Sequence, residues 1–222
     1  GDFSLADMPT RYRGEWRDQA DWLALAFHAD GEFPDRPYQY ATPERLVADL
    51  DRVAEEIVRF AGAEIYSPPT VIHWGMCPPC CLPALRERGV SVLSGFFGPG
   101  MDGRADVNYN MDAERSDIID REGALVDVNT GMIFSRVDIV CNNTPVAATA
   151  ATLEPNLDLP LKGEIADLFT HEQYFWPFYH NYVPDHFERL DTAIRWVTDH
   201  GYEPVFFHEG LMGGRTPTDL NA

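Results

Sequence analysis

Four of the seven histidines stand at or near the end of a short apolar run. They are His28 after residues 22–27, His73 within 70–74, His171 after 165–170 and His208 after 204–207. A neutral imidazole exchanges protons near pH 7 and is also a common zinc ligand. In parallel α/β folds the loops at the carboxyl ends of the strands converge on one site. The pattern therefore predicts four imidazoles at one rim, although a single histidine in such a place is more often a packing residue.

Acidic residues follow three of these histidines within four positions: Asp30, Glu32, Glu172 and Glu209. A carboxylate beside an imidazole fixes its tautomer, and the two groups together suit a divalent ion. We expect His28, Asp30 and His73 to be the metal ligands, with Zn²⁺ as the first candidate. Without a metal, the same groups would serve as general acid and base.

Aromatic residues are dense after His171, where six fall within a dozen positions: Tyr174, Phe175, Trp176, Phe178, Tyr179 and Tyr182. Exposed aromatic rings pack on the C–H faces of sugar rings, whereas about half of such side chains fill core. We expect Trp74, Tyr174 and Trp176 to bind a carbohydrate. Arg136 and His208 are further candidates for substrate contact.

Two other groupings leave alternatives open. Arg136 and Asp138 lie two positions apart on one expected strand and so face the same side, as a buried ion pair or as substrate contacts. Cys77, Cys80 and Cys81 form a CxxCC motif that is compatible with redox chemistry or a zinc half-site. A structural loop with incidental thiols is the preferred interpretation, because no second CxxC exists.

Short β-rich runs alternate with helical patterns along the chain, which is typical of parallel α/β folds. Strands are expected at 22–27, 70–74, 90–97, 132–140, 165–170 and 204–207, and helices at 10–20, 79–88, 112–122, 145–152 and 184–200. The strongest helix begins at Thr42-Pro43-Glu44, which combines an N-cap, a first-turn proline and a first-turn acid. The fold class is therefore α/β, as an irregular or incomplete (β/α) barrel of parallel strands that forms one domain over 1–222.

The chain of 222 residues carries a formal charge of −19 and a single lysine. So negative a surface disfavours nucleic acid and anionic membranes, which need basic patches. No stretch has the roughly 18 uncharged apolar residues of a membrane span. Four cysteines, two of them vicinal, do not suggest a disulfide framework, and the N-terminal residues lack the pattern of a signal peptide. We expect a cytoplasmic protein; homo-oligomers stay open.

Several segments carry a family resemblance. Residues 165–171 run into the aromatic loop, and 190–207 join a helix, His200-Gly201-Tyr202 and a last apolar run. Residues 22–28 end in a histidine, and 73–79 precede a helix and Arg88-Gly89-Val90. Together these stretches resemble the polysaccharide deacetylase superfamily, whose members fold as irregular (β/α) barrels. The paired aspartates of that superfamily's first motif have no counterpart before Trp22.

The resemblance implies metal-dependent deacetylation of a polysaccharide or an amino sugar. It makes His28 a metal ligand and His171 the general acid that protonates the leaving group, with Glu172 and Asp30 as further catalytic carboxylates. An alternative is a polysaccharide lyase or glycosidase on the same barrel, in which His171 works with Tyr174 or Glu172. A third reading is a carbohydrate-binding domain without catalysis.

Overall fold

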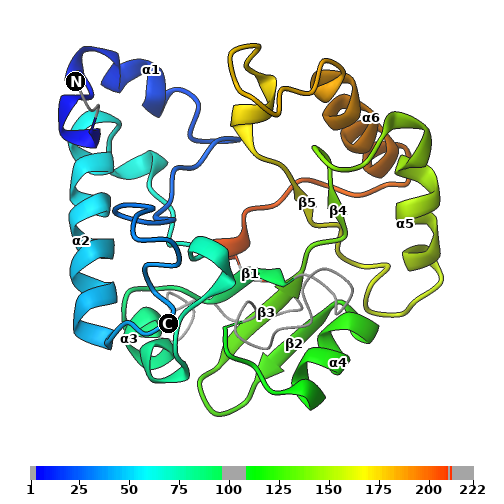
Figure 1. Cartoon of the computed structure of the whole chain (residues 1–222), viewed down its shortest axis with the longest axis horizontal. Helices are drawn as coiled ribbons and strands as arrows, with labels where there is room; N and C mark the ends of the chain where they lie inside the picture. Colours follow the sequence, from blue (N-terminus) through cyan, green and yellow to red (C-terminus); the bar gives the residue numbers. More distant parts are fainter. Residues whose placement is uncertain (1–3, 97–108, 210, 212–222) are drawn as a thin grey trace.

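The computed structural model describes residues 4–96, 109–209 and 211. Its α-helices are α1 (Arg13–Arg17), α2 (Pro43–Phe60), α3 (Leu82–Glu87), α4 (Ala113–Glu122), α5 (Thr149–Leu157) and α6 (His186–Asp199). Its strands are β1 (Val92–Phe96), β2 (Ala124–Asp127), β3 (Met132–Arg136), β4 (Ile139–Val140) and β5 (Leu168–Phe169). Short 3₁₀ turns are η1 (Leu5–Asp7), η2 (Thr10–Tyr12), η3 (Ala63–Ile65), η4 (His73–Gly75), η5 (Pro79–Cys81), η7 (Val146–Ala148), η8 (Glu172–Phe175) and η9 (Phe207–Glu209). Helices α2 and α3 lie on one side of the strands, and α5 and α6 on the other (Figure 1).

Parallel pairing dominates the strands, as an α/β fold requires. Strand β1 pairs parallel to β3, and β4 pairs parallel to β5. Two further contacts between extended segments add to this parallel pairing without forming a full strand ladder. Leu25 bridges Tyr66 in parallel, and the amide of Ser94 in β1 donates to the carbonyl of Thr70 at 2.6 Å. The expectation of an α/β fold with parallel strands is therefore confirmed.

The described residues do not form a closed barrel, and several expected strands differ. Residues 22–27 contribute only one bridge, and 70–74 turn into η4. Residues 204–207 are not a strand either, because the Glu209 carboxylate accepts the Phe206 amide at 2.8 Å and starts η9. The expected strand 132–140 breaks after Arg136, where the Asp138 carboxylate accepts the amide of Asp167 at 2.9 Å.

Strand β2 was not expected, and it runs antiparallel to β3. The two strands form a hairpin whose turn is set by local side-chain bonds. The carboxylate of Asp127 accepts the amide of Asn129 at 3.2 Å and the hydroxyl of Thr130 at 2.7 Å. Gly131 then adopts φ 69°, a left-handed conformation that glycine takes without strain. The hairpin signal lies in this Asp-Val-Asn-Thr-Gly run rather than in any hydrophobic alternation.

Helix α2 forms as the sequence predicts. The Thr42 hydroxyl accepts the Arg45 amide at 3.3 Å, and Pro43 occupies the first turn. Its apolar stripe is buried as a set: Leu46, Leu50, Val53, Ile57 and Phe60. Burying one such side chain contributes about 1.5–3 kcal/mol, so this face anchors the helix to the strands.

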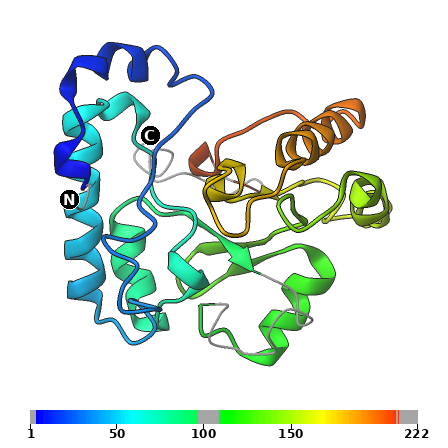
Figure 2. The same ribbon diagram turned by 45° about the horizontal axis from the view of Figure 1, so that its top comes forward.

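The two faces of β1 and β3 enter different cores. Leu93 and Phe134 join the large cluster that α2 and α3 cover. Val92 and Ile133 point the other way and pack with Leu211. A third cluster joins β4 to α5 and α6, which lie together beside it (Figure 2). In the described part of the chain, no helix has the length and apolar character needed to cross a membrane.

Candidate functional site

His28 and His73 meet directly, although 45 residues separate them. The distance from His28 Nε2 to His73 Nδ1 is 2.9 Å, and the rings are nearly perpendicular with centroids 4.9 Å apart. The backbone brings them together, because the His73 amide donates to the His28 carbonyl at 3.1 Å. This pairing places the end of the 25–28 stretch against η4.

The hydrogen bonds around His28 fix where its proton sits. Its Nδ1 lies 3.0 Å from the carbonyl oxygen of Val71, which can only accept, so Nδ1 carries a hydrogen. In the neutral ring, Nε2 is then an acceptor, and the 2.9 Å contact requires His73 Nδ1 to donate to it. The remaining nitrogen of His73, Nε2, keeps its lone pair. A chain of two hydrogen bonds from Val71 thus prepares His73 Nε2 as a base.

His171 joins this pair from the carboxyl end of β5. Its Nδ1 lies 3.3 Å from Asn142 Oδ1, which follows the paired strand β4. The ring of His171 packs edge-on against Phe169, with centroids 4.8 Å apart. The charge state of His171 is coupled to His28 and to Glu32, so these groups lie within electrostatic reach. We call His28, His73 and His171 the histidine cluster.

Burial lowers the pKa of two members of the histidine cluster. Both His73 and His171 are half-buried, and desolvation of the imidazolium is the main cause in each case. The positive form of His28 lowers both values further. Glu32 acts in the opposite sense on both, and Glu172 does so on His171. The balance favours neutral imidazoles at pH 7, which is the state that accepts protons.

Trp74 stands beside the cluster in an unusual backbone conformation. Its φ is 62°, a left-handed value that is rare for a bulky residue and typically marks a turn or a strained position. The indole Nε1 donates to Asp35 Oδ1 at 3.0 Å, and the guanidinium of Arg36 lies 5.4 Å from the ring. The side chain nevertheless remains 46% exposed, so part of the indole is free to contact a ligand.

The aromatic segment after His171 is divided between packing and exposure. Tyr174 lies 6.0 Å from His171 between ring centroids and 5.5 Å from Tyr179. Trp176 and Phe178 stack with an interplanar angle of 15° and are 52% and 87% exposed. This stacked pair presents apolar surface to solvent close in sequence to His171.

Two predicted site residues, Asp30 and Arg136, have other partners in the structure. Asp30 forms a two-pronged ion pair with Arg52, at 2.9 and 3.2 Å. Arg136 donates to the Asp120 carbonyl at 3.1 Å, which ties β3 to α4. These bonds give both side chains a structural role that sequence position alone did not reveal.

His208 is the fourth strand-end histidine, and it lies with Ser67 rather than with the histidine cluster. The Ser67 hydroxyl is 2.9 Å from His208 Nδ1. Ser67 is bonded through its amide to Leu25, three residues before His28. Residues 204–207 do not pair as a strand, so the strand-end argument did not apply to His208.

The fit to a metal ion was tested against these contacts. Among residues 4–96, 109–209 and 211, no three His, Cys, Asp or Glu side chains are grouped to hold an ion. His28 uses both nitrogens in hydrogen bonds, and Asp30 is committed to Arg52. As arranged, the proposed ligands His28, Asp30 and His73 do not fit a zinc site.

Sequence reasoning missed Asn142 and Asn143. Both come after Cys141 at the carboxyl end of β4, so the rule that selected His28 and His171 also applies to them. A neutral amide neither titrates nor carries a charge, so its residue type alone does not mark it as part of a site. The hydrogen bond from His28 to the Val71 carbonyl could not be predicted from residue types, because the acceptor belongs to the backbone.

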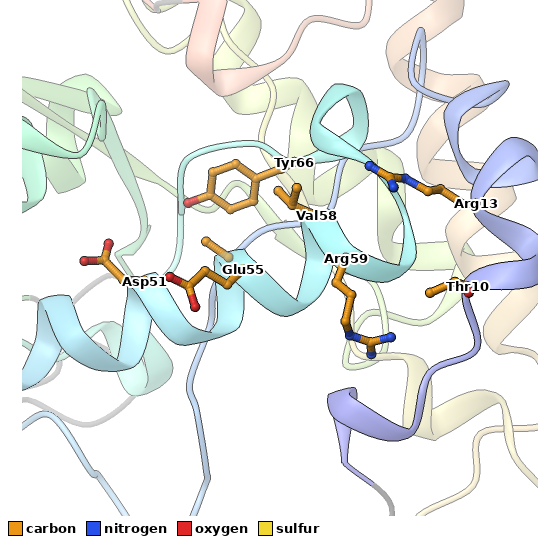
Figure 3. Close-up of a pocket in the computed structure, with 8 residues that line it drawn as sticks. Thr10, Arg13, Asp51, Glu55, Val58, Arg59 and Tyr66 are labelled. Atoms are coloured by element: carbon orange, nitrogen blue, oxygen red, sulfur yellow. The ribbon is translucent and has the colours of Figure 1, made fainter.

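A cavity of about 860 Å³ lies along the outer side of α2 (Figure 3). It is lined by Thr10, Arg13, Asp51, Ala54, Glu55, Val58, Arg59 and Tyr66. The guanidinium of Arg59 donates hydrogen bonds to the carbonyls of Leu5, Ala6 and Met8. These bonds hold the N-terminal turns against α2. None of the predicted site residues lines this cavity, which marks it as a surface groove separate from the histidine cluster.

Comparison of the chain with protein-family models, with curated proteins and with solved structures found no match.

Proposed function

We propose that the protein is a carbohydrate-active hydrolase of deacetylase type, with the histidine cluster as its catalytic centre. One observation carries the proposal: two imidazoles from separate segments lie near His28, that of His73 at 2.9 Å and that of His171 within electrostatic reach. His73 and His171 have pKa values lowered by burial and by a neighbouring imidazole, and perturbed pKa values of this kind are typical of acid–base sites. The resemblance of several sequence segments to polysaccharide deacetylases supports the same assignment.

The protein groups suggest the following division of labour. His73 Nε2 removes a proton from water, and the water oxygen attacks the carbonyl carbon of an acetyl ester or acetamide. The positive charge that forms on His73 is shared with His28, whose Nε2 accepts from His73 Nδ1. His171 takes up a proton from solvent at Nε2 and gives it to the departing sugar oxygen or nitrogen as the acyl bond breaks, and His73 becomes neutral again by releasing its proton to solvent.

The exposed aromatic residues provide the proposed sugar contacts. Trp74 adjoins His73, and the stacked pair of Trp176 and Phe178 follows His171. Flat apolar rings suit the C–H faces of pyranose rings, and a stack of two rings offers more area than one. The strong negative charge fits a neutral or cationic sugar better than an anionic one.

The second candidate is a lyase or glycosidase in which His171 works with Tyr174. The 6.0 Å distance between their rings favours Tyr174 over the exposed Glu172 as the partner. This reaction forms an unsaturated sugar or a new reducing end, whereas deacetylation forms acetate. Product analysis therefore separates the two.

The proposal is tested by measuring acetate release from acetylated oligosaccharides. We expect His73→Ala and His171→Ala each to lower kcat by about 10²- to 10⁴-fold, the usual contribution of a general acid or base. The exposed His180 is the matched control, and His180→Ala should keep wild-type activity. Full activity in both cluster variants would end the proposal, and sugar binding without any turnover would leave a binding domain.

The divalent ion implied by the resemblance remains a prediction with its own measurement. Metal content of the purified protein and activity after chelation test it together. An ion bound in stoichiometric amount, lost in His28→Ala and His73→Ala, would require the contact between these rings to open around it. Activity that survives complete metal removal would support the acid–base scheme.

A further inference from the structure

We infer that Asn142 is a positioning residue that holds the proton of His171 on Nδ1 and so makes Nε2 the working atom of that imidazole. The catalytic meaning of this inference rests on the proposed function, whereas the proton position does not. Asn142 is buried, at 4% exposed, and follows β4 after Cys141, while His171 follows the adjacent strand β5. The two side chains meet because parallel strands end at the same edge.

The orientation of the Asn142 amide follows from its neighbour. Its Nδ2 donates to Asn143 Oδ1 at 2.8 Å, and a carbonyl oxygen can only accept. The other end of the amide, Oδ1, therefore faces His171 Nδ1 at 3.3 Å. Since Oδ1 is also an acceptor, His171 Nδ1 must carry the hydrogen. In the neutral ring, Nε2 then holds the lone pair.

Helix α6 keeps this arrangement in place. Arg189 donates to the backbone carbonyl of Asn142 at 3.0 Å and is itself fixed by Asp185, also at 3.0 Å. The carboxyl end of β4 is thus fastened to α6, 47 residues further along the chain. A neutral amide is also a different partner from a carboxylate, because it orients the ring without stabilising the imidazolium strongly.

For the reaction, this arrangement means that His171 exchanges protons through Nε2 alone. Protonation of His171 adds a hydrogen at Nε2 and leaves the Nδ1–Asn142 bond intact, so the proton enters and leaves at one atom. If Asn142 cannot accept, the proton moves between the two nitrogens and part of the population presents an N–H where a lone pair is needed. A smaller population of the Nδ1–H tautomer lowers kcat and does not change the affinity for the sugar.

The test reads the tautomer directly. Protein labelled with ¹⁵N-histidine is studied by long-range ¹H–¹⁵N correlation at pH 8, and the His171 signals are identified by their loss in His171→Ala. We expect a protonated Nδ1 and an unprotonated Nε2 in the wild type, and a shift toward Nε2–H in Asn142→Leu. Asn142→Asp should restore the wild-type tautomer, because a carboxylate also accepts. Asn181→Leu, at an exposed asparagine, should change nothing.

The outcomes separate this inference from the proposed function. A wild-type spectrum with the proton on Nε2 overturns the inference without any variant, even if Asn142→Leu does not fold. A folded Asn142→Leu with an unchanged tautomer overturns it as well. The predicted tautomer in a protein that releases no acetate upholds the proton position and refutes only the hydrolase. With activity present, kcat should fall by about 10²-fold in Asn142→Leu and recover in Asn142→Asp.

Discussion

At the scale of single residues, the site is defined by which oxygen each imidazole faces. His28 donates to the Val71 carbonyl, and His171 faces the Asn142 amide oxygen. Such contacts fix tautomers more strictly than burial does, because a carbonyl oxygen has no hydrogen to offer. The lone pairs at His73 Nε2 and His171 Nε2 follow from these contacts.

The stacked aromatic pair gives a prediction at this scale. Trp176→Ala and Phe178→Ala should each weaken binding of an acetylated oligosaccharide by about 5- to 10-fold, which corresponds to roughly 1 kcal/mol for a lost aromatic contact. Isothermal titration calorimetry measures the affinity. Phe187, 74% exposed on α6, serves as the control because its ring is not part of this stack. Equal losses in all three variants would mean that the pair has no special role.

The sequence predicted part of this site and missed the rest for identifiable reasons. His28, His73 and His171 were found because chemistry-bearing residues at strand ends converge in parallel folds. The ion pair of Asp30 with Arg52 could not be predicted, because it follows only from the packing of α2. Asn142 obeys the strand-end rule and went unnoticed because an amide does not titrate.

At the scale of elements, capping and buried polar groups decide where helices and strands begin and break. Helix α2 was predictable because its signals are local: the N-cap, the first-turn proline and an apolar stripe. The break between β3 and β4 was not predictable, since it depends on Asp138 accepting the amide of Asp167, 29 residues away. Polar contacts between residues far apart in the chain cannot be predicted from the sequence around either residue.

The N-cap of α2 supports a stability prediction. Thr42→Ala removes the acceptor for the Arg45 amide and should lower the free energy of unfolding by about 1 kcal/mol. Urea unfolding followed by circular dichroism measures it. Thr152→Ala is the matched control, because that exposed hydroxyl bonds back to the Ala148 carbonyl within α5 and should change stability little. A cost at Thr152 as large as at Thr42 would contradict the capping role.

The buried Asp167 predicts a pH dependence. Desolvation raises its pKa to about 7, and the charge of Asp138 adds to the shift. Ser94 in β1 donates to this carboxyl group at the start of β5. Between pH 4 and 7 the folded state binds the proton that the unfolded state has lost, so the free energy of unfolding falls as the pH rises through this window.

Asp167→Asn removes this dependence and keeps an acceptor for Ser94. Relative to the wild type, the variant should gain stability between pH 5 and pH 8, by up to about 3 kcal/mol for a shift of this size. Urea unfolding at the two pH values gives the comparison. A difference between variant and wild type that is the same at pH 5 and pH 8 would show that Asp167 is ionised in the folded protein.

At the scale of the whole molecule, charge is the dominant global property. A net charge of −19 on 222 residues makes the folded chain repel itself. Most ion pairs among the described residues join an arginine to an acid on the surface and contribute only about 0–1 kcal/mol each. Composition alone established this property, whereas barrel closure depends on strand pairing that the described residues do not complete.

Screening of this charge should stabilise the fold. The melting temperature is expected to rise by several degrees between 10 mM and 500 mM NaCl, because salt weakens long-range repulsion more than short contacts. Differential scanning calorimetry measures the change, and sucrose in place of salt serves as the control for general solvent effects. A melting temperature that falls with NaCl would indicate that local ion pairs outweigh the net repulsion.

The claim on which the functional account rests is that the histidine cluster is one electrostatic unit. An NMR titration of the His171 ring in the wild type and in His28→Gln tests it directly, with His180→Gln as control. Because the positive form of His28 lowers the pKa of His171, we predict a higher pKa for His171 in His28→Gln and no change in His180→Gln. An unchanged pKa of His171 in folded His28→Gln would show that the two imidazoles do not share a site.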